Sequence, residues 1–443
     1  MVTSDENLVH LKHKVMEETC RLAWNNAINE KTIHDLIYQI IPGTSPQFRC
    51  CVYKERAIIA ERIQLSLANN LKQGSHNVVQ VIEPACDQCS IAAYSVTDNC
   101  RFCIGKPCLS SCAFDAITPG EFRMHIDPSK CKECGKCADA CPFGAIGSKT
   151  YLVQIIRDIL AGKEVIAMVA PSIEGQFGED ISLDSIRDAM KKIGFSDMVE
   201  VGLGGDMTAA YEAEEWSEAR KEGKKMTTSC CPAFKYMMKK HFPDQYRDNM
   251  STTVSPMCAV SRYLKATHPD CVTVFIGPCI AKKAETYETS LPDNADYAVT
   301  FGELRALMRS KDIKFEPKES GYQESSVFGK KFATSGGVAN AVIEVMNERG
   351  EDTSDIKLNR AAGGDACKKA LMMLKAGKLQ EDFIEGMICD SGCVGGPSKH
   401  RTEREIMKAR AALLSKADGR KILENLKGYP MEEFSMHKGA PQN

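Results

Sequence analysis

The sequence predicts an α/β domain with parallel sheets, preceded by a short cysteine-rich domain and an N-terminal helical segment. From about residue 150 onward, apolar runs of strand length alternate with helix-like stretches, and this alternation is typical of α/β domains with parallel strands. Between residues 86 and 148, cysteines, prolines and glycines crowd together and apolar periodicity fades. We therefore divide the chain into residues 1–85, 86–148, 149–401 and 402–443.

Residues 1–85 have the apolar periodicity of helices and contain no motif that indicates a function. Residues 55–65 place apolar side chains at helical spacing. The segment also holds Cys20 and the vicinal pair Cys50 and Cys51. A vicinal pair without a second pair nearby is more often structural than metal-binding, and the role of Cys50 and Cys51 stays open.

The α/β part begins with a buried-strand run at residues 165–170, followed by an amphipathic helix at 183–193 that Gly194 ends and by a strand at 271–276. Pro171 and Ser172 follow the first strand, and Cys279 follows the later one. Ligands collect beyond the carboxyl ends of parallel strands, so we expect these loops to meet at one cavity. Residues 402–443 are expected to form a charged helical tail, either packed or solvated.

Composition excludes several classes of protein. The 443 residues carry a net charge of -2 with both signs interspersed, and no basic tract indicates a nucleic-acid partner. The N-terminus lacks a basic region followed by an apolar one, and no apolar run approaches the roughly 20 residues of a membrane-spanning helix. We therefore expect a cytoplasmic protein with no membrane association. In a reducing compartment, 21 cysteines favour metal or redox chemistry over disulfides.

The cysteine-rich segment has the spacing of a two-cluster ferredoxin. Cys131, Cys134, Cys137 and Cys141, the last followed by Pro142, match the bacterial run in which the fourth cysteine ligates the other cluster. The partner half is Cys100, Cys103, Cys108 and Cys112, which is two residues longer than usual between its second and third cysteines. We predict a 2x(4Fe-4S) ferredoxin-like domain with one cluster on the set Cys131, Cys134, Cys137 and Cys112, and the other on the set Cys100, Cys103, Cys108 and Cys141.

Two alternatives stay open in this segment. Zinc also binds paired Cys-x2-Cys motifs in tetrahedral structural sites, although eight cysteines in two sets of four favour iron. Cys86 and Cys89 form an extra pair, which is structural, half of another site, or an alternative ligand set for the lengthened half.

Three further cysteine-bearing stretches lie far apart, at residues 228–232, 278–285 and 385–396. Soft iron-sulfur centres select thiolates, and a 4Fe-4S cube needs four; Cys231, Cys279, Cys389 and Cys393 supply that number. The alternative is that these are buried cysteines acting as small hydrophobes. In order and content the three stretches resemble the active-site signatures of FeFe-hydrogenases.

That resemblance implies an H-cluster, in which a 4Fe-4S cubane is joined to a two-iron subsite that carries carbon monoxide, cyanide and azadithiolate. The four cysteines just named would ligate the cubane, and Cys393 would also bridge to the two-iron subsite. Lys282 matches the lysine that donates to a cyanide, a role that suits a compact ammonium with three donors. Pro171, Ser172 and Met387 match groups that line the cofactor pocket.

The resemblance also implies a proton route. Cys230 matches the thiol that exchanges protons with the azadithiolate amine, and Ser251, Glu212 and Glu215 match the outer relay. The i, i+3 spacing of the two glutamates places them on one helix face, although a solvated acidic helix is the alternative. Glu285 would support the outer relay or the cluster loop.

Several positions depart from the common pattern of the family. Gly277 replaces a methionine, Met257 replaces a glutamine, and residues 395–398 replace a third glycine and a glutamine. Phe234 stands where the commoner pattern has tryptophan. Together with the Cys-Asp-x-Cys segment at residues 86–89, Phe234 resembles a divergent, compact branch of the family.

The sequence thus predicts an iron-only hydrogenase, an oxidoreductase that interconverts two protons and two electrons with dihydrogen. Its expected partners are ferredoxin or a similar soluble carrier and the maturation factors that build the cofactor. Two alternatives are a non-catalytic relative that acts in iron-sulfur protein assembly, which typically lacks the counterpart of Cys230, and a hydrogen sensor with slow turnover. Physiological direction, oxygen tolerance and oligomeric state are not readable from the chain.

Overall fold

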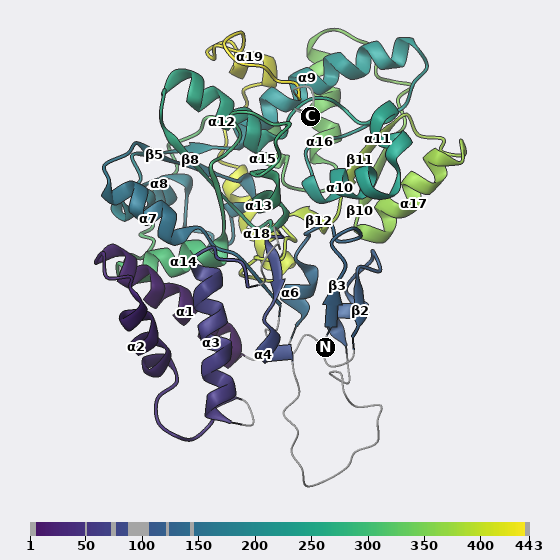
Figure 1. Cartoon of the computed structure of the whole chain (residues 1–443). Helices are drawn as coiled ribbons and strands as arrows, with labels where there is room; N and C mark the ends of the chain where they lie inside the picture. The colour runs from purple at the N-terminus through teal and green to yellow at the C-terminus, as the bar shows by residue number, and fades with distance from the viewer. Residues whose placement is uncertain are drawn as a thin grey trace. The chain divides into compact units, whose positions relative to one another are not determined.

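The computed structural model describes residues 6–48, 51–71, 77–86, 106–120, 124–141 and 146–438. The chain forms two compact units (Figure 1), the first made of Met1–Ala161 with Gly302–Ile313 and the second of Gly162–Phe301 with Lys314–Asn443. The predicted ligands Cys100 and Cys103 lie outside the described residues, as do Cys50, Cys89 and the side chain of Cys86.

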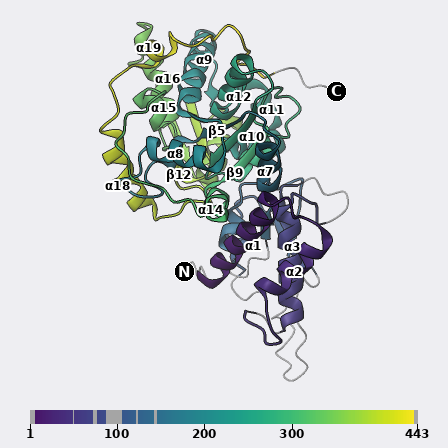
Figure 2. The same cartoon turned by 90° about the vertical axis from the view of Figure 1, so that its left-hand side faces the viewer.

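Three helices begin the first unit: α1 (Glu6–Trp24), α2 (Glu30–Ile40) and α3 (Val52–Ser66). They lie side by side (Figure 2) and bury an apolar core that includes Val15, Ile41 and Ile63. The Asn29 side chain caps α2 by accepting the Thr32 N–H at 3.0 Å, which satisfies one of the donors left free at a helix start. Helix α7 (Leu152–Leu160) packs against α1, and α14 (Phe301–Ser310) contributes Ser310, whose hydroxyl accepts the Trp24 indole N–H at 3.0 Å.

The cysteine-rich part of the first unit consists of short elements. These are β1 (Val79–Val81), α4 (Glu83–Cys86), α5 (Pro107–Ser110), β2 (Ile117–Pro119), β3 (Met124–Ile126), α6 (Lys136–Ala140) and β4 (Ile146–Ser148). Strands β2 and β3 form an antiparallel pair, and so do β1 and β4. Strand β1 falls inside the segment expected to be helical. Three residues carry too little periodicity to be recognised as a strand, and the partner of β1 lies more than sixty residues along the chain.

The second unit contains a four-stranded sheet in the order β6-β5-β8-β9, with all three pairings parallel. Its strands are β5 (Val165–Val169), β6 (Asp197–Glu200), β8 (Val272–Gly277) and β9 (Tyr297–Thr300). The predicted helix at 183–193 is α8 (Leu183–Ile193), capped by Ser182 and ended by Gly194 at φ 122°. The predicted α/β class with parallel sheets is therefore confirmed.

A second parallel sheet has the order β10-β11-β7. It consists of β7 (Met226–Thr227), β10 (Leu358–Ala362) and β11 (Phe383–Met387), and β12 (Asp390–Cys393) follows β11 along the chain. Because the strands are parallel, the loops after β7 and β11 leave the same edge of this sheet.

Helix α9 (Gly202–Lys221) lies at the centre of the second unit. It packs against α12 (Pro256–Thr267), α15 (Val327–Lys331) and α16 (Gly337–Glu348). Gly204 allows the close approach of α12, since a Cβ there would lie 2.2 Å from the Pro256 carbonyl oxygen. Trp216 of α9 is fully buried against Phe383 of β11, with ring centroids 4.5 Å apart. The remaining elements are η2 (Pro171–Ile173), α10 (Pro232–His241), α11 (Pro243–Asn249), α13 (Ala281–Glu285) and α17 (Gly364–Lys375).

The C-terminal residues form α18 (Glu403–Leu414) and α19 (Ile422–Leu426), followed by an extended stretch that pairs with residues 252–254. Thr253 and His437 form an antiparallel bridge, and the Val254 N–H donates to the Met436 carbonyl at 2.8 Å. Residues 402–443 were given two alternatives, a packed or a solvated tail. The extended stretch is packed against residues 252–254. Among the described residues, no helix combines the length and apolarity needed to cross a bilayer.

Candidate active site

The loops that carry the predicted active-site residues leave the carboxyl ends of parallel strands. Pro171 and Ser172 follow β5, and Cys279 follows β8, in the four-stranded sheet. Cys231 follows β7, and Cys389 follows β11, in the three-stranded sheet. This is the edge at which side chains in α/β domains converge on a ligand.

Direct contacts join the three cysteine-bearing stretches. The Cys231 thiol accepts the backbone N–H of Ile388, and the Ser398 N–H donates to the Pro278 carbonyl at 3.1 Å. Lys282 Nζ lies 3.4 Å from the carbonyl oxygen of Cys230. The fold thus brings residues that are more than 150 positions apart into one site.

The thiols of this site lie close enough to influence one another. Burial, followed by the charges of Cys231 and Cys393, raises the pKa of Cys279. Burial and Cys231 likewise raise the pKa of Cys393 to about 11, while Lys282 lowers it. A thiol loses its proton when it binds a metal, so a metal centre at this place would bind these cysteines as thiolates.

Cys389 joins the same loop as Cys393. The Gly392 N–H donates to the Cys389 carbonyl at 3.1 Å, and Gly392 has φ 74°. This left-handed conformation suits glycine, and a Cβ at Gly392 would lie 2.7 Å from the backbone nitrogen of Ser335. The turn between the two cysteines therefore depends on this glycine.

Lys282 is buried and has three oxygen neighbours. Its ammonium lies 2.6 Å from Glu285 Oε2 and 2.9 Å from Ser255 Oγ, in addition to the Cys230 carbonyl. Burial lowers the pKa of Lys282, but the charge and hydrogen bond of Glu285 outweigh it, and the net shift is upward. The lysine is therefore held as a cation beside the thiols, and Glu285 is the acidic partner that holds it there.

Three polar side chains, those of Glu212, Ser251 and Glu215, lead from Cys230 toward the surface. Glu212 is fully buried and its Oε1 accepts the Ser229 N–H at 3.0 Å. Burial, with the charge of Glu215, raises the pKa of Glu212 to about 7, although the Ser229 N–H lowers it. The hydroxyl of Ser251, close enough to Glu212 to lower its pKa as well, donates to Glu215 Oε2 at 2.7 Å.

The thiol at the inner end of this series is also shifted. Burial, with the charge of Glu212, raises the pKa of Cys230 well above its ordinary value. A neutral thiol beside a carboxyl that titrates near pH 7 is suited to moving protons. Glu212 Oε2 has no hydrogen-bond partner within the described ranges, so this oxygen can accept one.

A buried ionic cluster supports the loop that carries Pro171 and Ser172. Arg410 of α18 donates to the Pro171 carbonyl and lies 3.4 Å from Glu174 Oε2. Lys330 lies 2.6 Å from Glu200 Oε1 and 3.4 Å from Glu174 Oε1. All four charged side chains are buried, and the sequence analysis missed them because they come from four separate elements with no common spacing.

One lysine of the run at residues 235–240 is paired inside the protein. Lys235 is buried and pairs with Glu288 at 2.6 Å. Single lysines within a charged run give no sequence signal for burial, because the ion-pair partner lies on another element.

The predicted cluster ligands of the first unit that are described lie together. Burial and then the charges of Cys134, Cys131, Cys112 and Cys108 raise the pKa of Cys137. Cys141 instead lies beside Lys12 and Arg62, and burial lowers the pKa of both these cations. Cys108, which the spacing assigns with Cys141 to the other ligand set, thus also lies near Cys137. Within the described ranges, no three potential ligands converge on the position of a single metal ion.

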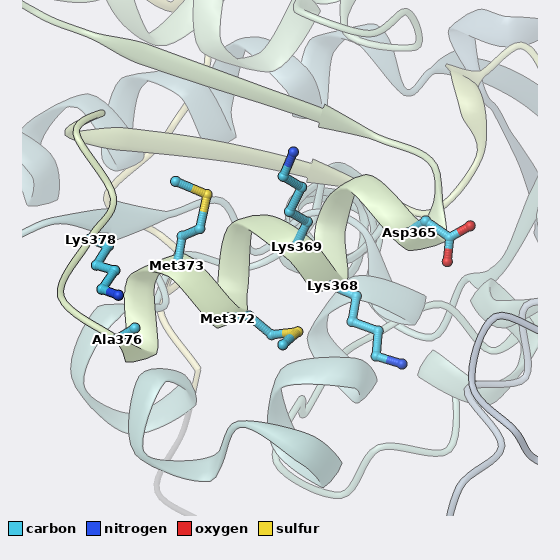
Figure 3. A pocket seen from close by; sticks show the side chains of 7 residues that line it. All are labelled: Asp365, Lys368, Lys369, Met372, Met373, Ala376 and Lys378. Carbon is cyan, nitrogen blue, oxygen red and sulfur yellow. The ribbon is translucent and has the colours of Figure 1, made fainter.

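One surface hollow of about 330 Å³ lies over α17 and is separate from this site. Figure 3 shows the lining side chains along α17, with Lys368 and Met372 on one side of the helix and Lys369 and Met373 on the other. None of the predicted site residues lines it. The candidate active site is therefore the one defined by the loops and thiols above.

Comparison with known proteins assigns the chain to a family. Residues 163–397 match the family described as iron only hydrogenase large subunit, C-terminal domain, and residues 124–147 match a 4Fe-4S binding domain. The chain belongs to the iron-only hydrogenase family. The match covers the loops after β5, β7, β8 and β11, in which the candidate site lies.

Two curated relatives and one solved structure indicate the degree of similarity. The chain is 26% identical over 394 residues to the NADP-reducing hydrogenase subunit HndD of Solidesulfovibrio fructosivorans, which covers 74% of this chain and 66% of HndD. It is also 26% identical to Iron hydrogenase 1 of Clostridium pasteurianum, over 89% of this chain and 87% of that protein. A variant of the FeFe-hydrogenase HydA1 from Chlamydomonas reinhardtii shares the fold at TM-score 0.52 and 21% identity, covering 66% of this chain and 99% of HydA1.

Close packing accompanies some of the positions at which this chain departs from the common pattern of its family. A Cβ at Gly277 would lie 2.6 Å from the Phe275 ring, so that ring takes space next to the loop that a longer side chain would need. A Cβ at Gly396 would lie 2.8 Å from Pro278 Cβ. A Cβ at Gly386 would meet the ring of Phe234 at 2.4 Å. These small residues let the signature loops pack directly against one another.

The residues of the site fit the cofactor type that the family implies. Ser172 Oγ is buried and has no hydrogen-bond partner in the described part of the chain. Cys393 keeps accessible surface, even though burial is the main cause that raises its pKa. The site therefore presents a hydroxyl and a thiol that can contact a bound group, beside the cation of Lys282. Met387, which is buried at the end of β11, completes the set of predicted pocket residues.

Proposed function

We propose that this chain is a working iron-only hydrogenase, which reversibly combines two protons and two electrons into dihydrogen. The observation that carries the proposal is the series from Cys230 through Glu212 and Ser251 to Glu215, which begins beside Lys282 and the cluster thiols. A protein that only assembled or carried an iron-sulfur cluster would have no need of a buried proton route.

Four thiolates, from Cys231, Cys279, Cys389 and Cys393, would hold the cubane of the H-cluster. When bound, the two-iron subsite with its carbon monoxide, cyanide and azadithiolate ligands supplies the redox chemistry and the basic amine. Cys393 would bridge to that subsite. Lys282 would orient it by a charge-assisted hydrogen bond, which is shorter and stronger than a neutral one. Ser172, Pro171 and Met387 would line its pocket.

Proton delivery would use the chain's own titratable groups. The Cys230 thiol would give its proton inward and regain one from Glu212, whose pKa of about 7 leaves both protonation states populated near neutrality. Ser251 would pass a proton between the two carboxyls by rotating its hydroxyl. Glu215, which accepts the backbone N–H of Thr252 at 2.7 Å, would be the outer carboxyl of the relay.

Electrons would enter through two 4Fe-4S clusters in the first unit. Cys131, Cys134, Cys137 and Cys112 would hold one, and Cys100, Cys103, Cys108 and Cys141 the other. The match of residues 124–147 to a 4Fe-4S binding domain supports the first set. The electron donor would be ferredoxin or a similar soluble carrier in the cytoplasm, and maturation factors would be needed to install the H-cluster.

Anaerobic infrared spectroscopy of protein matured with its assembly factors tests this function. We expect cyanide and carbonyl stretches, and hydrogen evolution with a reduced dye. Absence of those bands in protein that carries its full iron complement would contradict the proposal and favour an assembly protein. Intact bands with almost no turnover would instead favour the hydrogen sensor.

A further inference from the structure

The last described residues of the chain run along the outer end of the candidate relay. Residues 435–438, here called the C-terminal strap, are fixed by backbone contacts on both sides. The Lys438 N–H donates to the Thr252 carbonyl at 3.0 Å, and Val254 donates to Met436. Arg262 Nη1 donates to the His437 carbonyl at 2.8 Å. The strap therefore occupies a defined position beside residues 251–254.

The Lys438 side chain reaches into the relay itself. Its ammonium donates to the Ser251 carbonyl at 2.7 Å, while the Ser251 hydroxyl donates to Glu215 Oε2. Lys438 thus holds Ser251, the residue that lies between the carboxyls of Glu212 and Glu215. Its neighbour His437 contacts the Thr252 hydroxyl through Nδ1 at 2.9 Å, and the Thr252 N–H donates to Glu215 Oε1.

The charges around Lys438 come from three directions. Glu212 and Glu215 face it from α9, Lys235 faces it from α10, and Glu288 faces it from the loop after α13. Lys235 and Glu288 form an ion pair, so the two carboxyls of α9 are the acidic groups left for Lys438 to offset. Burial and then Lys235 lower the pKa of Lys438 to about 8, and Lys438 in turn lowers the pKa of Glu212.

The strap also borders a route to solvent. A hollow of about 390 Å³ lies beside it, lined by Arg262, Lys265, Asp293, Glu433 and His437 among others. His437 is exposed. His437 thus lines the hollow and also contacts Thr252, whose N–H donates to Glu215 Oε1.

We propose that the C-terminal strap completes the proton relay, with Lys438 as a positioning residue that holds Ser251 between Glu212 and Glu215. The inference rests on the hydrogenase function proposed above. Lys438 itself passes no proton in this scheme, because its hydrogen bond goes to a carbonyl oxygen. It acts through the geometry of Ser251 and through its charge.

A titration of protein without the two-iron subsite tests the strap independently of turnover. The protonated carboxyl stretch of Glu212 is followed by infrared difference spectroscopy against pH, and Glu212→Gln identifies the band by removing it. Loss of one nearby positive charge disfavours the carboxylate, so Lys438→Met should raise the midpoint by about half to one pH unit. Lys438→Arg retains a cation and a donor and should keep the original midpoint. Lys427→Met, a change to an exposed lysine of the same region, should also leave it unchanged.

The pH profile of hydrogen evolution in matured protein gives the second readout. Lys438→Met should move the limb near pH 7 to higher pH, because Glu212 must be protonated to return a proton to Cys230 and then stays protonated to higher pH. It should also lower the rate on the acidic side of that limb by about two- to threefold, because Ser251 is no longer held in position. Lys438→Arg should restore most of the rate. If both variants shift alike, or if Lys438→Met leaves the carboxyl midpoint unchanged, the inference is overturned. If matured protein lacks the cofactor bands, the proposed function fails, while the carboxyl titration still decides the role of Lys438.

Discussion

Lys282 Nζ lies 2.6 Å from Glu285 Oε2, one turn along the same helix, and both side chains are buried. A buried cation beside thiols needs a fixed counter-charge, because removing an ion from water costs several kcal/mol unless it is paired. Ser255 and the Cys230 carbonyl occupy the other sides of the ammonium. Glu285 therefore keeps Lys282 charged and oriented, and both features are required of a donor to an anionic ligand.

The first prediction breaks this pair. Lys282→Met leaves the Glu285 carboxylate buried without its partner and should destabilise the protein by about 3–5 kcal/mol. Chemical denaturation of cluster-reconstituted protein without the two-iron subsite measures the loss. The double variant Lys282→Met with Glu285→Gln should recover part of the stability but not the retention of the two-iron unit. Equal stability of all three proteins would show that the pair of Lys282 and Glu285 contributes nothing to the free energy of folding.

The second prediction concerns pH and Glu212. Its folded pKa of about 7 lies above the ordinary value of 4.5, so the folded state holds its proton more tightly than the unfolded state does. The resulting stabilisation is complete below about pH 4.5 and is lost as pH rises through about 7, a change of about 3 kcal/mol. Denaturation midpoints measured from pH 5 to 8 should therefore fall more steeply for the native sequence than for Glu212→Gln. Glu214→Gln, at an exposed neighbour, serves as the control; identical slopes for the native sequence and Glu212→Gln would disprove the titration.

The third prediction separates two adjacent cysteines. Cys231→Ala should disrupt the cubane and with it the attachment of the two-iron unit. Cys230→Ala should keep the infrared signature yet lose most hydrogen evolution, because a methyl group cannot exchange protons. Cys230→Asp, which restores an ionisable group, should recover part of the rate. Cys258→Ala, a change at a buried cysteine of the same unit, controls for packing. Normal turnover in Cys230→Ala would show that the proton route lies elsewhere.

The fourth prediction concerns the electron path. Cys134 lies near Cys112 and Cys137, so Cys134→Ala should reduce iron content by up to one cluster and slow electron uptake from ferredoxin. The organometallic bands of the second unit should stay visible. Cys271→Ser changes a cysteine outside the predicted ligand sets and should leave iron content unchanged. Unaltered iron and ferredoxin-linked activity in Cys134→Ala would remove Cys134 from the ligand set.

Local features of the chain were readable because their causes are local. The run at 165–170 is apolar over a strand's length and became β5. Gly194 ends the helix that begins at residue 183 because glycine tolerates the positive φ found there. The cysteine spacings indicated iron-sulfur clusters for a similar reason, because a cluster determines how many residues separate its ligands on one loop.

Contacts between distant elements could not be predicted from such local features of the sequence. Arg410, Lys330, Glu174 and Glu200 come from α18, α15, the loop after η2 and the end of β6, and each alone looks like a surface charge. Lys438 looked like part of a polar tail until the strap was seen to pair with residues 252–254. No periodicity encodes such a meeting, because the partner depends on how the whole chain packs.

The sequence by itself determined the family, the parallel α/β class and the residues that carry the predicted chemistry, because motif spacing and apolar periodicity are properties of short stretches. Only the tertiary structure decided the surroundings of those residues. It paired Lys282 with Glu285, buried Glu212 so that its pKa rises to about 7, and brought Lys438 against Ser251. Burial and charge act through space rather than along the chain, and the distances that govern them exist only once the chain has folded.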